Sequence, residues 1–179
     1  TRSGAKAGDW LYVTGDLGDA ALALLHLKEG VLTDSEAIEH VQRKLDYPRP
    51  RVLAGQALRE YASAAIDISD GLLADLGHIC QASNVGANVV LDAIPLSETM
   101  KKSQLFEDAV ELALNGGDDY ELLFTVSEDK KVGLETALSH TSTSVTCIGQ
   151  INASQTISTT LNNKPVAIKS SGFQHFSSQ

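Results

Sequence analysis

The stretch Ile66-Asp67-Ile68-Ser69-Asp70-Gly71-Leu72 constrains the fold more than any other, because it predicts a turn from a buried strand into a helix. Residues 64–68 are apolar enough for a buried strand, whereas apolar residues over 72–80 recur at helical spacing. A chain that joins short strands to helices in this way folds in layers around a sheet.

Three side chains in this turn suit a metal-bound phosphate. Asp67 and Ser69 are two residues apart, so on a strand they are expected to point to the same side. Asp70 is predicted to be the helix N-cap, and Gly71 permits a close backbone approach. Free N–H groups at a helix start attract phosphate, and carboxylates bind Mg²⁺. The alternative is an ordinary capped helix after a strand, and the local spacing does not decide between the two.

A second acidic turn lies between a helical run and an apolar strand at 122–126. Gly116 and Gly117 end the helical run, and Asp118 and Asp119 follow at the mouth of the strand. Alone, acids after a Gly-Gly turn are more often structural than catalytic. Two acidic turns in one small domain favour a functional site.

Both turns resemble signatures of the thiamine-monophosphate kinase family. The resemblance rests on residues 65–72 with Asp75-Leu76, and on Gly116–Leu122, where the family usually has Glu before the Asp. Residues 1–10 resemble the family's entry into its C-terminal domain, and 172–176 its C-terminus. Phosphoribosylaminoimidazole synthetase, selenophosphate synthetase and a hydrogenase-maturation protein are similar in fold but differ in these segments. The site motifs therefore favour the kinase branch.

The resemblance implies roles for four residues near the nucleotide. Asp67 and Asp70 match the family's Mg²⁺ ligands, and Ser69 matches a hydroxyl that contacts ATP. Arg2 matches an arginine that contacts ATP phosphates, a task that suits its fixed fork of donors. A frayed terminal side chain is the alternative for Arg2.

Two further residues are implied in binding thiamine monophosphate. Asp118 matches a substrate-binding acid that is usually Glu, so its reach is one methylene shorter and a water-mediated contact is possible. Asp119 could take over that role. Phe173 matches an aromatic residue that stacks on the thiamine rings, although an aromatic residue here is also typical of a core anchor for the tail.

The implied reaction transfers the ATP γ-phosphoryl group to the phosphate of thiamine monophosphate, giving thiamine diphosphate and ADP. The second pKa of a phosphate acceptor is about 6, so no general base is needed. This agrees with a site rich in Asp, and the histidines are expected to be structural: His26, His40, His78, His140 and His175. The alternatives are another ATP-dependent synthetase of this superfamily and a non-catalytic binding module.

Length and composition fit one domain. The 179 residues, 42% of them apolar, are enough to bury a core. We expect an α+β fold, a mixed sheet layered with helices, resembling the C-terminal domain of aminoimidazole-ribonucleotide synthetase. In the family, a metal-binding and dimerisation domain precedes the residue that matches Thr1. We therefore expect residues 1–179 to be the C-terminal domain of a two-domain homodimeric kinase, inactive alone.

Charge and composition exclude several classes. The net charge of −9, from 23 acids against 14 bases, argues against nucleic-acid binding. No apolar run approaches the roughly 20 residues of a membrane span, and no secretory signal is visible. Cys80 and Cys147 lie in apolar stretches and are expected to be reduced. These features predict a cytoplasmic protein without membrane or nucleic-acid partners.

Periodicity and turn residues predict the remaining elements. Strands are expected at 10–14, 87–91 and 144–148, with a hairpin of 156–161 and 165–169 about Asn162-Asn163. Helices are expected at 19–28, 35–44 after an Asp34-Ser35 cap, 51–61 and 127–139 with Ser127 as cap, and a short helix or turn is expected at 95–101.

Overall fold

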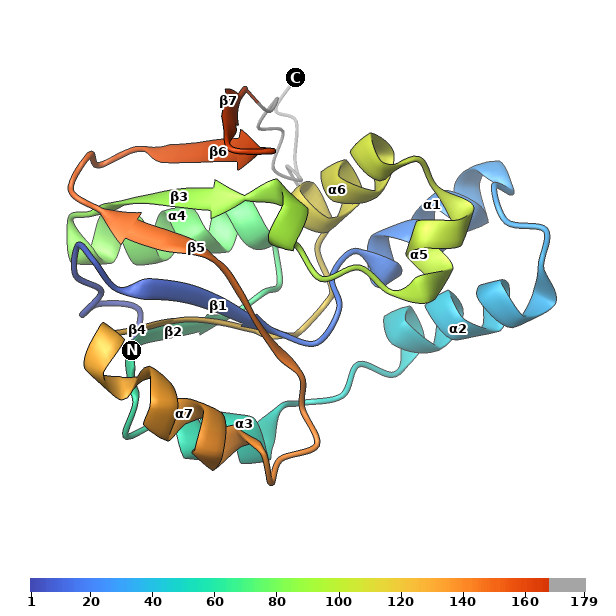
Figure 1. The fold of residues 1–179 in the computed structure, drawn as a ribbon. Coiled ribbons are helices and arrows are strands. Elements are labelled where there is room, and N and C mark those ends of the chain that lie inside the picture. Colours follow the sequence, from blue (N-terminus) through green and yellow to red (C-terminus); the bar gives the residue numbers. More distant parts are fainter. Residues whose placement is uncertain (168–179) are drawn as a thin grey trace, which may run out of the picture.

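Short apolar segments form one mixed sheet in the computed structural model, which describes residues 1–167 (Figure 1). The strands are β1 Trp10–Thr14, β2 Ala62–Asp67, β3 Gly86–Val90, β4 Leu122–Val126, β5 Val145–Asn152, β6 Ile157–Leu161 and β7 Lys164–Val166. Their order is β2-β4-β1-β5-β3-β6-β7. Within the described residues β3 and β6 are parallel and the other neighbours are antiparallel, so the predicted mixed sheet is confirmed.

Seven α-helices and two 3₁₀ turns accompany the sheet in this part of the chain. The helices are α1 Asp19–Glu29, α2 Ser35–Asp46, α3 Val52–Leu58, α4 Leu72–Ser83, α5 Glu98–Ser103, α6 Phe106–Asn115 and α7 Lys131–Leu138. The 3₁₀ turns are η1 Leu91–Ala93 and η2 Glu128–Lys130. None of these helices has the length and apolar character needed to cross a bilayer.

Successive side chains of the central strands point to opposite faces of the sheet, so the apolar core is divided into two clusters, one on each face. In β1, Leu11 and Val13 join the larger apolar cluster with α4 and α6, while Trp10 and Tyr12 join the smaller one with α3 and α7. Tyr12 stacks on Phe124 of β4, with ring centroids 5.6 Å apart. Figure 1 shows α3 and α7 side by side on one face and α4 on the other. A central strand buried on both sides thus accounts for the uninterrupted apolar run in β1.

Local residue preferences set the ends of several elements, and two of them, the Asp34 cap and the Asn162-Asn163 turn, were predicted. The Asp34 carboxylate accepts the N–H of Ala37 and caps α2, and Gly30, in the left-handed conformation at φ 68°, ends α1. Asn162 and Asn163 have φ of 50° and 60°, as the two-residue hairpin between β6 and β7 requires.

Three predicted helix boundaries were wrong. The element expected from Pro95 begins at Glu98, because the Ser97 side chain accepts the N–H of Met100 and caps α5. The helix expected at 51–61 ends at Leu58, because the Tyr61 N–H turns back to the Leu58 carbonyl and the extended β2 starts at Ala62. Ser127 does not cap a helix with its side chain, since the η2 turn comes between Ser127 and α7. Cys80 and Cys147 are free, in agreement with the expected reduced state.

Candidate functional site

The two acidic turns lie side by side because their strands are antiparallel neighbours. Strand β2 ends at Asp67, directly opposite Leu122, where β4 begins. The chain therefore leaves β2 into the first turn at the same edge of the sheet where it arrives from the second turn. Sheet topology brings together residues that are about fifty positions apart in the sequence.

Backbone hydrogen bonds extend the pairing beyond the strands. The N–H of Ile68 donates to the carbonyl of Glu121 (2.8 Å), and the N–H of Tyr120 donates to Ile68 (2.8 Å). The N–H of Asp118 donates to the carbonyl of Ser69 (3.0 Å). A Cβ atom on Gly117 would lie 2.5 Å from that Ser69 oxygen, so glycine is required for this close approach. The two turns therefore form one hydrogen-bonded unit.

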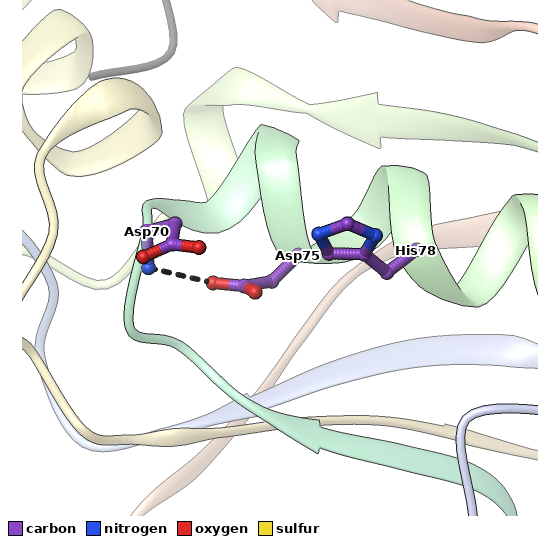
Figure 2. A group of neighbouring side chains, drawn as sticks. All are labelled: Asp70, Asp75 and His78. Carbon is purple, nitrogen blue, oxygen red and sulfur yellow. Dashed lines mark hydrogen bonds between the residues drawn. The ribbon is translucent and has the colours of Figure 1, made fainter. Parts of the chain in front are cut away.

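Asp75 holds the first turn from within α4. Its Oδ2 accepts the N–H groups of Ser69 (2.9 Å) and Asp70 (3.1 Å), and Figure 2 shows its side chain turned back toward the backbone of Asp70. The prediction that Asp70 caps the helix was wrong, because Gly71, at φ 112°, is the cap residue and has no side-chain hydrogen bond. Ser69 also lies beyond β2, so it does not share a strand face with Asp67.

Asp70, Asp75 and His78 present three potential ligand atoms within 4.8 Å of one another (Figure 2). Asp75 is 2% exposed, and burial, opposed by its two backbone hydrogen bonds, raises the pKa of its carboxyl. Its position is explained by holding the turn. The cluster therefore gives no separate evidence of a metal site.

Asp67 and Asp70 have the character of magnesium ligands. Both are exposed, and no ion pair within residues 1–167 engages either carboxylate. Hard carboxylate oxygens with few competing protein partners are the donors that Mg²⁺ uses beside substrate phosphates. The donor set thus fits that ion.

Asp118 lies on the same surface as these two acids. The hydroxyl of Tyr120 donates to Asp118 Oδ1 at 3.3 Å. The negative charge of Asp118, followed by burial and then by smaller effects that include the charges of Asp67 and Asp70, raises the pKa of Tyr120. Asp118 and Tyr120 both have positive φ, at 67° and 49°, which non-glycine residues rarely adopt. Three carboxylates and a phenol therefore share one electronegative surface.

Asp119 points inward. Both of its carboxylate oxygens accept the N–H of Gly18, at 3.1 and 3.0 Å, at the start of α1. Although the residue as a whole is half-buried, burial of the carboxylate, reinforced by the charges of Asp19 and Glu121, raises its pKa to about 8. Asp118 and Asp119 thus have different environments, and Asp118 is the one at the site surface.

Arg2, which was also predicted to be a site residue, does not lie at this surface. Arg2 is exposed, and its carbonyl accepts the hydroxyl of Ser83 at the far end of α4 from Ser69. Since α4 has 12 residues, that end is about 18 Å away along the helix. Phe173 lies outside the described residues.

Two buried or partly buried features next to the site were not predicted. Arg51 forms an ion pair with Glu121 beneath the second turn. The Nδ2 atom of Asn115, the last residue of α6, is buried without a hydrogen-bond partner within residues 1–167. Glu121 stands in the acidic motif, but no sequence signal pairs it with an arginine 70 positions away.

Comparison with known proteins decides the family. Residues 6–162 match the family described as AIR synthase related protein, C-terminal domain. The chain belongs to this family. It is 43% identical to thiamine-monophosphate kinase of Escherichia coli K12 over 98% of this chain and 55% of that protein. It is 46% identical to the enzyme of Salmonella typhimurium LT2, over 98% of this chain and 54% of that protein. The resemblance seen in the sequence is thereby confirmed.

Several solved structures have the same fold as this chain. The crystal structure of thiamine-monophosphate kinase from Stenotrophomonas maltophilia has a TM-score of 0.84 and 40% identity, over 92% of this chain and 53% of that one. AaThiL complexed with AMPPCP and TMP has a TM-score of 0.74 and 31% identity, over 98% and 53%. E. coli HypE, at 20% identity and a TM-score of 0.68, shares the fold. The chain spans about half the length of the relatives it matches.

Proposed function

We propose that this chain is the C-terminal half of a thiamine-monophosphate kinase, which transfers the γ-phosphoryl group of ATP to thiamine monophosphate. The observation that carries the proposal is the pairing of the two acidic turns, each of which resembles a signature of that kinase family. Relatives that are 43–46% identical over 98% of the chain bear this name, and one related structure is complexed with AMPPCP and TMP.

Asp67 and Asp70 would hold Mg²⁺ on the phosphates. The ion supplies neutralisation of charge between two anions that otherwise repel each other. The chain's own contribution is to keep these carboxylates exposed, on a turn fixed by Asp75 and by the backbone bonds to the second turn. The hydroxyl of Ser69 is proposed to contact ATP. The guanidinium of Arg2, whose main chain lies at the other end of α4, is proposed to contact ATP at a point away from Ser69.

Asp118 is proposed to bind thiamine monophosphate, with Phe173 stacking on its rings. Because the acceptor phosphate is already largely ionised at neutral pH, the site needs no base to remove a proton. The rate then depends on in-line positioning of donor and acceptor and on charge neutralisation. A surface with three carboxylates suits that task better than acid–base chemistry.

The whole enzyme is proposed to be a cytoplasmic homodimer without nucleic-acid or membrane partners. Its other half is proposed to supply further metal ligands and the dimer contacts. On this view the 179-residue chain folds but has negligible activity alone.

The test is an assay of phosphoryl transfer from ATP to thiamine monophosphate with Mg²⁺, using the full-length protein and this chain side by side. Formation of thiamine diphosphate by the full-length protein alone supports both the reaction and the need for the other half. If the full-length protein binds ATP but forms no thiamine diphosphate, the kinase proposal is refuted and a related ATP-dependent synthetase is favoured. Robust turnover by the isolated chain would refute the half-enzyme proposal.

A further inference from the structure

Glu121, which ends the second acidic turn, is held by a two-pronged contact from Arg51. Arg51 Nε donates to Glu121 Oε2 at 2.7 Å, and Arg51 Nη2 donates to Oε1 at 2.5 Å. The side chain of Glu121 is 4% exposed and that of Arg51 is 21% exposed. A buried carboxylate is stable only when it is paired and hydrogen-bonded, and the planar arginine fork satisfies both of its oxygens at once.

Strand β1 supplies the rest of the Glu121 pocket. The Thr14 hydroxyl donates to Glu121 Oε2 at 2.6 Å and accepts the N–H of Leu122 at 2.8 Å. A Cβ atom on Gly15 would lie 2.2 Å from Glu121 Oε1, so glycine leaves the room that this carboxylate occupies. Glu121 is therefore fixed by β1, by the start of α3 and by its own backbone.

The segment before Arg51 limits how the guanidinium reaches Glu121. Pro48 and Pro50 restrict φ on either side of Arg49, and Arg51 is the cap residue of α3. Arg49 is exposed and forms no ion pair within residues 1–167, whereas Arg51 turns into the protein. Two neighbouring arginines thus have opposite environments, and this makes Arg49 a matched control.

The second acidic turn, which Glu121 ends, has an unfavourable backbone conformation that contacts with the rest of the protein must hold in place. Asp118 and Tyr120 have positive φ, which local preferences disfavour in residues other than glycine. The backbone of Glu121 also takes part in the unit, since its carbonyl accepts the N–H of Ile68. A shift of Glu121 would therefore loosen the hydrogen bonds that join the two turns.

We infer that Arg51 is a positioning residue: by holding Glu121 in its buried pocket, it keeps Asp118 beside the turn that carries Asp67 and Asp70. Arg51 acts through Glu121 and is not assigned any contact with substrate. The kinetic part of this inference rests on the proposed function, whereas the structural part rests on geometry alone.

The structural test compares hydrogen exchange in the full-length protein and its Arg51→Met variant. Exchange of the backbone peptide spanning 116–121 is expected to accelerate about tenfold or more, while exchange within α4 changes less than about twofold. Because Arg51→Met leaves a buried charge unpaired, the double variant Arg51→Met/Glu121→Gln is measured as well. It removes that charge but does not restore the fork, so fast exchange at 116–121 should persist. Equal acceleration throughout the chain, or none at 116–121, overturns the inference.

The kinetic test separates the two substrates. Arg51→Met should raise the KM for thiamine monophosphate about tenfold while leaving the KM for ATP within about twofold, since Asp118 is assigned to the acceptor. Arg51→Lys keeps the charge but loses the planar fork, so its KM for thiamine monophosphate should lie between those of the wild type and Arg51→Met. Arg49→Met should have the KM values of the wild type. Equal shifts in both KM values overturn the inference. A wild-type protein that does not phosphorylate thiamine monophosphate refutes the proposed function, and hydrogen exchange then decides the positioning role.

Discussion

Asp67 and Asp70 differ from the inward-facing acids next to the site in what surrounds them. Asp75, Asp119 and Glu121 turn inward and accept hydrogen bonds, whereas Asp67 and Asp70 are exposed and engaged in no ion pair within residues 1–167. Charge placed at a protein surface without a protein partner is available to a ligand. Their contribution is thus expected to appear in activity and not in stability.

The double variant Asp67→Asn/Asp70→Asn in the full-length protein tests this expectation. Loss of charge neutralisation should lower the rate of phosphoryl transfer roughly a hundredfold or more. The free energy of unfolding should change by less than about 0.5 kcal/mol per site, because Asp70 is not the helix cap. Steady-state kinetics and urea denaturation measure the two quantities. The control Glu60→Gln/Glu107→Gln removes two exposed acids elsewhere, and a similar loss of activity in it would contradict the metal role.

Asp118→Asn tests the acceptor site at the same scale. Asn keeps the side-chain shape and also tolerates positive φ, so the turn should survive, but the negative charge is lost. We expect the KM for thiamine monophosphate to rise about tenfold, with the KM for ATP within about twofold. Initial-rate measurements, with the concentration of each substrate varied in turn, give the two KM values. An unchanged KM for the acceptor would show that the Asp118 charge is not used in binding.

At the scale of elements, the site depends on how closely the two turns approach. Gly117→Ala places a methyl group 2.5 Å from the carbonyl oxygen of Ser69, which cannot move without breaking the paired turns. We expect a loss of about 1–3 kcal/mol in the free energy of unfolding, together with reduced activity. Gly77→Ala in α4 is the control, because its Cβ meets nothing within 4 Å. It should stabilise by about 0.5–1 kcal/mol. Urea midpoints in the opposite order would contradict the steric argument.

Strand and helix types followed from local patterns, whereas several boundaries did not. Apolar runs predicted β1 and β4 to the residue, and Asp34 and Asn162-Asn163 predicted a cap and a turn, because these signals act within a few positions. The cap of α4 was predicted wrongly because the cap residue is Gly71, one position after Asp70, and the Asp75 carboxylate instead accepts the N–H groups of Ser69 and Asp70, which precede the helix.

At the scale of the whole molecule, buried acids converge beneath the site from separate elements. Asp19 of α1 contacts His40 of α2 (3.0 Å) and Ser97 (2.6 Å), and Glu121 is paired with Arg51. Asp119 has the Gly18 N–H as its hydrogen-bond donor, and its pKa is raised to about 8. Folding therefore binds a proton at Asp119 that the unfolded chain releases near pH 4.

This linkage predicts how stability changes with pH. Below about pH 4 the carboxyl is protonated in both states, so its stabilising effect is fully present. As pH rises from about 4 to 8 the unfolded state alone ionises, and the free energy of unfolding falls by up to about 1.4 kcal/mol per pH unit from this group. Asp119→Asn lacks that slope, so its stability relative to the wild type should rise across this range. Thermal midpoints of both proteins from pH 5 to 8 test this, and parallel profiles would refute the raised pKa.

The sequence by itself determined the strands and helices, the two acidic motifs and the resemblance to a kinase family, because each depends on residues close together in the chain. The tertiary structure alone decided that the motifs meet, since that follows from the antiparallel pairing of β2 with β4. It also decided which of the adjacent acids Asp118 and Asp119 faces the surface and which arginine reaches Glu121. Those choices depend on burial and on contacts across many sequence positions, and neither is encoded in local spacing.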